Sequence, residues 1–143
     1  MGGKYSGGCY NGAISLGVFI VNSDRIKDSY HICILTQLLQ FLGAWVGVAL
    51  ALSIKGEDGM KYTQPMEGYS EGFVFYVEML CTFFITTMAL HQKTNPNTDD
   101  PVLKIASFAI STFAFGTIAG PYTGGCLSPQ VCTASMSFNK LMN

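Results

Sequence analysis

The sequence contains little charge. Of its 143 residues, 49% are hydrophobic and only 12% are Asp, Glu, Lys or Arg, whereas a soluble domain carries about 25% charged residues. The mean hydropathy is +0.33. This balance excludes an ordinary soluble domain and is typical of a membrane protein. The net charge is −1 and the sequence has no basic cluster, which excludes nucleic-acid binding and a polybasic anchor on anionic lipid.

The sequence also lacks the residue patterns of a reactive centre. Its five cysteines are scattered through mostly apolar segments, and none forms the close Cys/His pairs of a zinc site. No nucleophile with a nearby base and no phosphate-binding loop is present. We therefore expect free thiols, no metal, no cofactor and no enzyme activity. The first residues, MGGKYS, fit an acylation signal at Gly2, but the same glycine pattern recurs at residues 120–125, where acylation is impossible.

The charges cluster at residues 24–28, 55–61, 67–71 and 93–104. About 20 apolar residues suffice to cross the hydrocarbon core of a bilayer as a helix. The intervals therefore predict three transmembrane helices, at residues 29–54, 72–92 and 102–119. In the first of these, Gly43 and Gly47 place small residues one turn apart, which lets a neighbouring backbone approach closely.

The two ends of the chain carry one motif twice. GGKYSGGCYNGAIS occupies residues 2–15, and AGPYTGGCLSPQVC occupies residues 119–132. Each copy is glycine-rich and precedes a short apolar helical stretch, residues 13–21 and 129–138, of about half a membrane thickness. Irregular backbone exists at membrane depth only where protein or water surrounds it. We therefore expect two re-entrant segments, at residues 1–22 and 120–138.

The start of each short helix predicts a polar site. A helix N-terminus presents unpaired N–H groups and the positive end of the helix dipole. Asn11 and Ser128 stand at the capping positions, and Pro129 suits the first helical position, whereas Gly12 does not. Two such helices that meet head to head would favour neutral or anionic groups and repel cations and protons.

The paired motif resembles that of the aquaporin (major intrinsic protein) family. SGGCYNGAIS resembles the family's SGGHxNPAVS, and GPYTGGCLSPQVC resembles GPxSGGxLNPARS. FLGAWVG at residues 41–47 and VEMLCTFF at residues 77–84 are similar to the family's third and fourth spans. The resemblance implies an all-α integral membrane protein. It predicts one domain over residues 1–143, a partial aquaporin-like fold with three transmembrane helices and two re-entrant half-helices.

Several motif residues differ from the family pattern. Asn11 and Ala13 match the first Asn-Pro-Ala, but Gly12 replaces its proline. Pro129 matches the second. The other three positions of the second copy differ: Ser128 replaces asparagine, Gln130 replaces alanine and Val131 replaces the arginine of the selectivity filter. In the family, an acid at the position of Glu78 braces a re-entrant loop; a proton relay is the alternative role, because it is an ionisable group inside a span.

The resemblance leaves no room in this sequence for the family's first, second and sixth spans. We therefore expect other membrane protein subunits, together with lipid, to cover the faces that those spans occupy. The leading hypothesis is a degenerate, non-conducting aquaporin-like protein that serves as an accessory subunit of a larger membrane complex, for which an organellar inner membrane is one suitable setting. The alternative is a water or small neutral solute channel completed by oligomerisation or by a partner chain.

Overall fold

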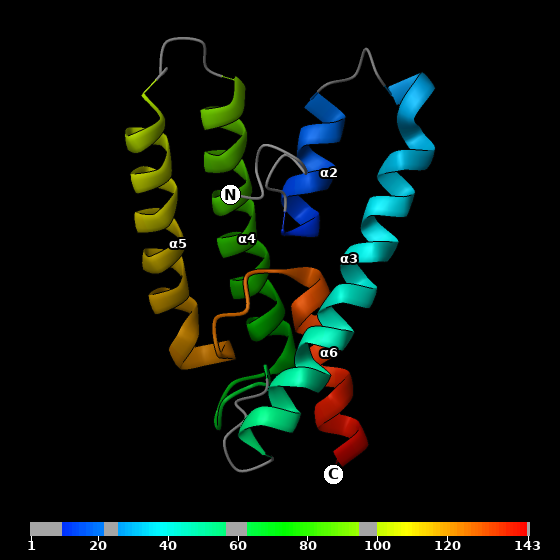
Figure 1. Ribbon diagram of the computed structural model, residues 1–143. Helices are drawn as coiled ribbons and strands as arrows, with labels where there is room; N and C mark the ends of the chain where they lie inside the picture. Colours follow the sequence, from blue (N-terminus) through cyan, green and yellow to red (C-terminus); the bar gives the residue numbers. More distant parts are fainter. Residues whose placement is uncertain (1–9, 22–25, 57–62, 95–99, 143) are drawn as a thin grey trace. The chain divides into compact units, whose positions relative to one another are not determined.

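The computed structural model describes residues 10–21, 26–56, 63–94 and 100–142. All regular elements in these residues are α-helices (Figure 1), which confirms the expected all-α class. The helices are α2 (Gly12–Val21), α3 (Ile26–Lys55), α4 (Glu71–Thr94), α5 (Pro101–Thr123) and α6 (Pro129–Met142). Gly2, Cys9 and most of the first glycine-rich motif lie outside the described residues, so the expected loop and the acylation signal stay predictions.

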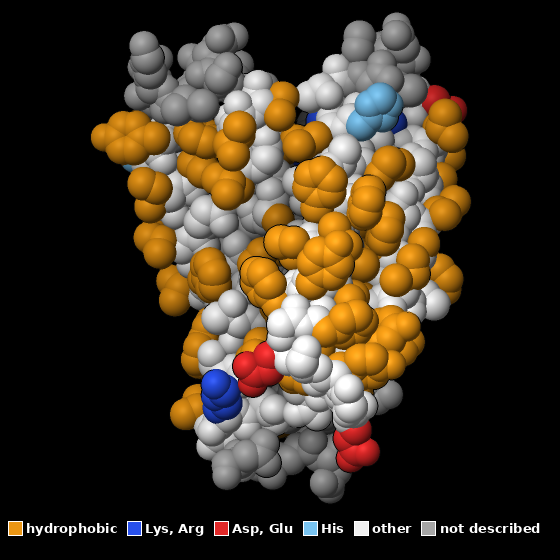
Figure 2. Space-filling model, turned by 180° about the vertical axis from the view of Figure 1, so that it is seen from behind, with side chains coloured by type: hydrophobic (Ala, Val, Ile, Leu, Met, Phe, Trp, Pro, Cys, Tyr) orange, Lys and Arg blue, Asp and Glu red, His pale blue; other side chains and the backbone are white. Residues whose placement is uncertain are grey.

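Three helices are long and apolar enough to cross a membrane: Tyr30–Lys55, Glu71–Thr94 and Pro101–Thr123. The three expected spans are therefore confirmed. In their most apolar windows only 6%, 17% and 6% of the residues are buried. Hydrophobic side chains are spread along the visible surface of the helices, and charged side chains lie near the helix ends (Figure 2). Such surfaces are suited to contact with lipid or with other apolar helices.

The chain divides into two compact units, and the single domain expected over residues 1–143 stays a prediction. Unit 1 comprises Met1–Lys61 and Ser128–Asn143, and unit 2 comprises Tyr62–Leu127. The division arises because α6 packs on α2 and α3, which lie far from it in the sequence, while α4 packs on α5. The two copies of the motif therefore deliver their short helices into the same unit.

Unit 1 is held together along α3. The ring of Trp45 on α3 lies 5.1 Å from the ring of Phe138 on α6, and Val48 of α3 and Ala134 of α6 are buried. In the other short helix, α2, Ile14 is buried where the helix packs on α3 and α6. Close packing of these small and apolar side chains fixes the positions of both short helices.

Unit 2 is a pair of helices with a small core. Phe84 of α4 and Phe115 of α5 stack with ring centroids 5.5 Å apart. Its buried side chains come from one face of each helix: Cys81, Ile85, Ala89, Ala119 and Thr123. Along each helix these residues lie four positions apart, which is the spacing of a single helical face.

Helix α5 continues past the boundary expected at Ala119 and ends at Thr123. It begins with a good cap, because Asp100 Oδ1 accepts hydrogen bonds from Val102 N at 2.8 Å and Leu103 N at 3.4 Å. Pro121 lies in the last turn, where a spanning helix tolerates the loss of one backbone hydrogen bond. Gly124, with φ of 89°, then ends the helix in the left-handed conformation. The irregular segment before α6 is thus shorter than the sequence predicts.

Candidate functional site

The candidate site lies in unit 1, where the first turns of α2 and α6 face each other. The two helices run in opposite directions away from this point (Figure 1). The backbone N–H of Gly12, the first residue of α2, donates to Oε1 of Gln130, the second residue of α6, at 3.0 Å. This head-to-head junction of α2 and α6 is the arrangement that the paired motif predicts.

Asn11 caps α2. Its Oδ1 accepts a hydrogen bond from Ala13 N at 3.0 Å, and its carbonyl accepts the first intrahelical bond from Ser15 N at 3.0 Å. This is the geometry of an N-cap side chain, which satisfies one of the donors left open at a helix start.

Ser128 stands at the equivalent position of α6, but its hydroxyl is directed elsewhere. Its carbonyl accepts from Cys132 N at 2.9 Å, as that of a capping residue does, and Pro129 follows as the first helical residue. The Ser128 hydroxyl, however, donates to Oε1 of Gln130 over 3.4 Å. The side-chain oxygen of Gln130 thus accepts hydrogen bonds from the starts of both helices.

The side chain of Gln130 fills the junction. It is 4% exposed, and its Nε2 donates to Oε1 of Gln37 on α3 at 2.9 Å. A Cβ atom built on Gly12 would lie 1.4 Å from this Nε2. The Gln130 amide therefore occupies the place of a residue-12 side chain, and it also accepts from the N–H that a proline at this position would lack.

Among the described residues, the groups that meet at the junction are neutral. The positive ends of two helix dipoles point at the Gln130 carbonyl oxygen, whose partial negative charge complements them. Because Gln130 is neutral, the site avoids the high free energy of an ion inside an apolar protein region. The arrangement holds the two helix starts together through one amide group.

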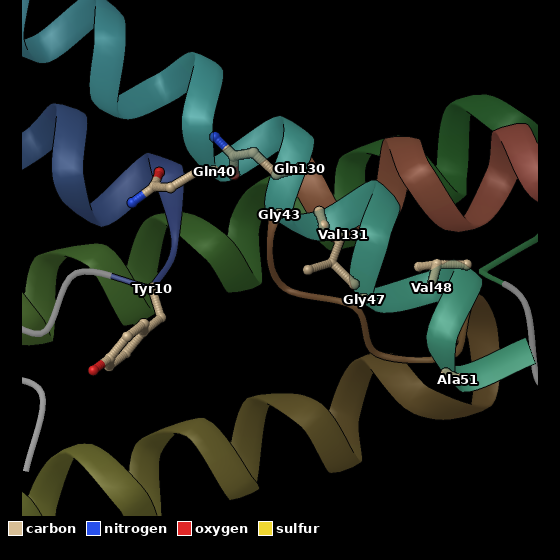
Figure 3. Close-up of a pocket in the computed structure, with 9 residues that line it drawn as sticks. Tyr10, Gln40, Gly43, Gly47, Val48, Ala51, Gln130 and Val131 are labelled. Atoms are coloured by element: carbon tan, nitrogen blue, oxygen red, sulfur yellow. The ribbon is translucent and has the colours of Figure 1, made fainter. Parts of the chain in front are cut away.

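A groove of about 490 Å³ runs along α3 beside the junction. Val131, which is 42% exposed, lies next to the turns of α3 that carry Gly43 and Gly47 (Figure 3). Among the described residues, no atom comes within 4 Å of a Cβ built on either glycine. The expected close neighbour is therefore not part of the described chain. The remaining lining residues are Tyr10, Gln40, Ala44, Val48, Ala51 and Gln130.

Glu78 organises the loop of unit 2 that leads to α6. Its Oε1 accepts from Cys126 N at 3.1 Å and its Oε2 from Leu127 N at 2.9 Å. The Thr123 hydroxyl also donates to Oε1. Backbone φ angles of 68° at Gly125 and 55° at Leu127 turn these N–H groups toward one carboxylate.

The sequence profile of the family described as Major intrinsic protein matches residues 1–139. The chain belongs to the major intrinsic protein family. Searches of curated proteins and of solved structures found no match. Together with the three apolar helices, the family identifies an integral membrane protein, and its members are channels rather than enzymes.

Within this major intrinsic protein, the unusual motif residues lie together. Gly12 and Gln130 are in direct contact, Ser128 donates to Gln130, and Asn11 and Ala13 form the cap beside them. Val131 lines the adjoining groove. Glu78, Gly43 and Gly47 are not part of the junction.

Sequence analysis missed one residue of the site, Gln37. This side chain completes the junction from α3, since its Nε2 donates to the Gly12 carbonyl at 3.1 Å while its Oε1 accepts from Gln130. A glutamine inside an otherwise apolar span was the available signal, because a polar group at that depth needs a partner.

Proposed function

We propose that this major intrinsic protein is closed at the junction of α2 and α6 and serves as a structural subunit of a larger membrane assembly. The observation that carries the proposal is the position of the Gln130 side chain, which is buried between the two helix starts. A solute that followed a route past both helix N-termini would have to displace this amide.

Displacement is opposed by the hydrogen bonds of Gln130. Its oxygen accepts from Gly12 N and from the Ser128 hydroxyl, and its nitrogen donates to Gln37. Moving the amide would leave a buried N–H of Gly12 without its acceptor, which costs about 1–3 kcal/mol. The junction is therefore a stable closure rather than a loosely filled gap.

The residue after Gln130 supports the same proposal. The family resemblance places a filter arginine at position 131, and the chain has valine there. Valine offers neither a positive charge nor a hydrogen-bond donor, both of which such a filter uses to reject protons and cations. An open route at this point would therefore lack its expected selectivity, which favours a role other than selective conduction.

A structural role agrees with the outer surfaces of the helices. The apolar windows of α3 and α5 are 6% buried each, and the groove on α3 is floored by small residues that leave room for another backbone. We propose that other membrane protein subunits and lipid cover these faces, with α2 and α6 lying within the membrane as re-entrant half-helices.

The second candidate function is a channel for small neutral solutes. The groove beside Val131 favours it, because an apolar wall next to a neutral amide would suit a solute with little charge. In that case a partner chain or a second copy would close the open side of the groove.

Two measurements on the wild-type protein separate these functions. In proteoliposomes, the structural proposal expects osmotic water and glycerol fluxes equal to those of protein-free vesicles, and extraction of native membranes in a mild detergent should yield the chain in a complex larger than its own oligomers. Rapid flux of either solute would refute the closure. Migration of the extracted chain as a lone monomer would refute the structural role.

A further inference from the structure

Helix α3 presents two glutamines to α2 from successive turns. Gln37 Nε2 donates to the Gly12 carbonyl at 3.1 Å, and Gln40 Nε2 donates to the Ser15 hydroxyl oxygen at 2.7 Å. A separation of three residues places both on one face of the helix. Both side chains therefore attach α2 to α3, but they differ in what else they reach.

Only Gln37 is joined to Gln130 in a closed hydrogen-bonded ring. Gly12 N donates to Gln130 Oε1, Gln130 Nε2 donates to Gln37 Oε1, and Gln37 Nε2 donates back to the Gly12 carbonyl. Each of the two glutamine side-chain amides in the ring accepts through its oxygen and donates through its nitrogen. Gln37 thereby determines which way the Gln130 amide is turned.

The ring holds the Gln130 side chain in one of two orientations that are open to it. Gln130 lies between the junction and the groove of about 490 Å³ that it also lines (Figure 3). If Gln37 no longer accepted from Nε2, the buried orientation would leave that donor unsatisfied, and a buried unsatisfied donor is strongly disfavoured. Rotation toward the open groove would then become the favourable alternative.

We infer that Gln37 is the positioning residue that holds Gln130 across the junction, so that α3 determines whether the junction is closed. This inference rests on the proposed closure by Gln130. Gln37 lies outside both copies of the motif, whereas Gln130, whose position it controls, lies inside the second copy. Gln40, one turn further along the same helix, donates to the Ser15 hydroxyl oxygen instead and provides a matched comparison.

The test compares Gln37→Met with Gln40→Met, two variants that remove an amide from the same face of α3 while keeping a long side chain. Hydrogen exchange of the Gly12 amide is measured by NMR in nanodiscs. Loss of one hydrogen bond corresponds to about a fivefold acceleration of exchange. We expect this acceleration in Gln37→Met and none in Gln40→Met, and we expect both variants to lower the melting temperature of the protein. Unchanged Gly12 exchange in Gln37→Met would overturn the inference.

Water flux in proteoliposomes separates this inference from the closure itself. We expect Gln37→Met to raise flux to the level of Gln130→Ala, with no further increase in the double variant. Flux in Gln130→Ala but not in Gln37→Met would refute the role of Gln37 and leave the closure standing. Accelerated Gly12 exchange without flux in either variant would support the positioning role and refute the closure.

Discussion

The loop that leads into α6 and the first residue of α2 are held in different ways. The loop before α6 is held by a carboxylate, since Glu78 accepts from the backbone N–H groups of Cys126 and Leu127. The start of α2 is held by neutral amides, since Gln130 and Gln37 bond to the N–H and the carbonyl of Gly12. The two segments derive from copies of one motif, yet their supports share no residue type.

The difference follows from what each support must satisfy. The loop of unit 2 directs two backbone N–H groups and the Thr123 hydroxyl to one place, and a carboxylate accepts all three with strong, charge-assisted bonds. At Gly12 both a donor and an acceptor need partners, and two amides provide them: Gln130 accepts from the N–H and Gln37 donates to the carbonyl. We conclude that the carboxylate contributes more stability, whereas the amide ring determines what occupies the junction.

Removing the carboxylate should have the largest effect. Glu78→Ala removes the carboxylate that accepts from two backbone N–H groups and from the Thr123 hydroxyl, and we expect the free energy of unfolding to fall by about 3–5 kcal/mol. Glu78→Gln should lower the free energy of unfolding by less, because one side-chain oxygen remains as an acceptor. Thermal unfolding in detergent measures both, with Glu71→Gln at the exposed start of α4 as the control. Altered proton flux with unchanged stability would contradict the bracing role and favour a proton relay.

The next largest effect is expected at Gly12. Gly12→Pro removes the donor to Gln130 and places side-chain atoms where the Gln130 amide lies, because a Cβ there would be 1.4 Å from Nε2. We expect a loss of about 2–3 kcal/mol in the free energy of unfolding.

Gly12→Pro is best tested together with Gln130→Ala. The second substitution removes both the amide that clashes with the proline and the acceptor that needs the Gly12 N–H. The double variant should recover about 1–3 kcal/mol relative to the sum of the single variants, as coupled neighbours do. A double-mutant cycle by chemical unfolding measures this coupling. Additive losses would show that the two residues are not complementary.

A smaller effect is expected where the loop of unit 2 needs glycine. At Gly125, φ is 68° and a Cβ would lie 2.8 Å from the Gly116 carbonyl oxygen, so Gly125→Ala should lose about 1–2 kcal/mol. Gly43→Ala is the control, because no described atom lies within 4 Å of a Cβ there. Equal melting temperatures for the two variants would contradict the strained geometry of this loop.

The smallest effect compares the two helix caps. Asn11→Ala removes the acceptor of Ala13 N and should lower the free energy of unfolding by about 1 kcal/mol. Ser128→Ala should lower it less, since the Ser128 hydroxyl bonds to Gln130 over a long 3.4 Å. Chemical unfolding of both variants checks the order, and a larger loss for Ser128→Ala would reverse this part of the comparison.

The sequence predicted those features that depend on local pattern. Runs of apolar residues located α3, α4 and α5, and the repeated motif located the starts of α2 and α6 at Gly12 and Pro129. Capping by Asn11 was also predictable, because it depends on residues two positions apart. The end of α5 was not, since glycine and proline predict a break at residue 120 that the helix tolerates up to Thr123.

Local residue patterns could not predict the packing between helices that lie far apart in the sequence. The repeat predicted that α2 and α6 meet at their starts, but it gave no sign that both pack on α3, because that packing depends on contacts such as Trp45 with Phe138. For the same reason the substitutions at Gly12 and Gln130 looked like independent losses. In the structure they are a matched pair, and Gln37, more than 90 residues from Gln130 in the sequence, completes them.

Osmotic water flux in proteoliposomes that contain the wild type, Gln130→Ala, or the Gly12→Pro/Gln130→Ala pair tests the central claim most directly. If the Gln130 amide closes the junction of α2 and α6, the wild type will match protein-free vesicles and both variants will conduct faster. Rapid flux through the wild type, with no increase on removal of the Gln130 amide, would contradict the account.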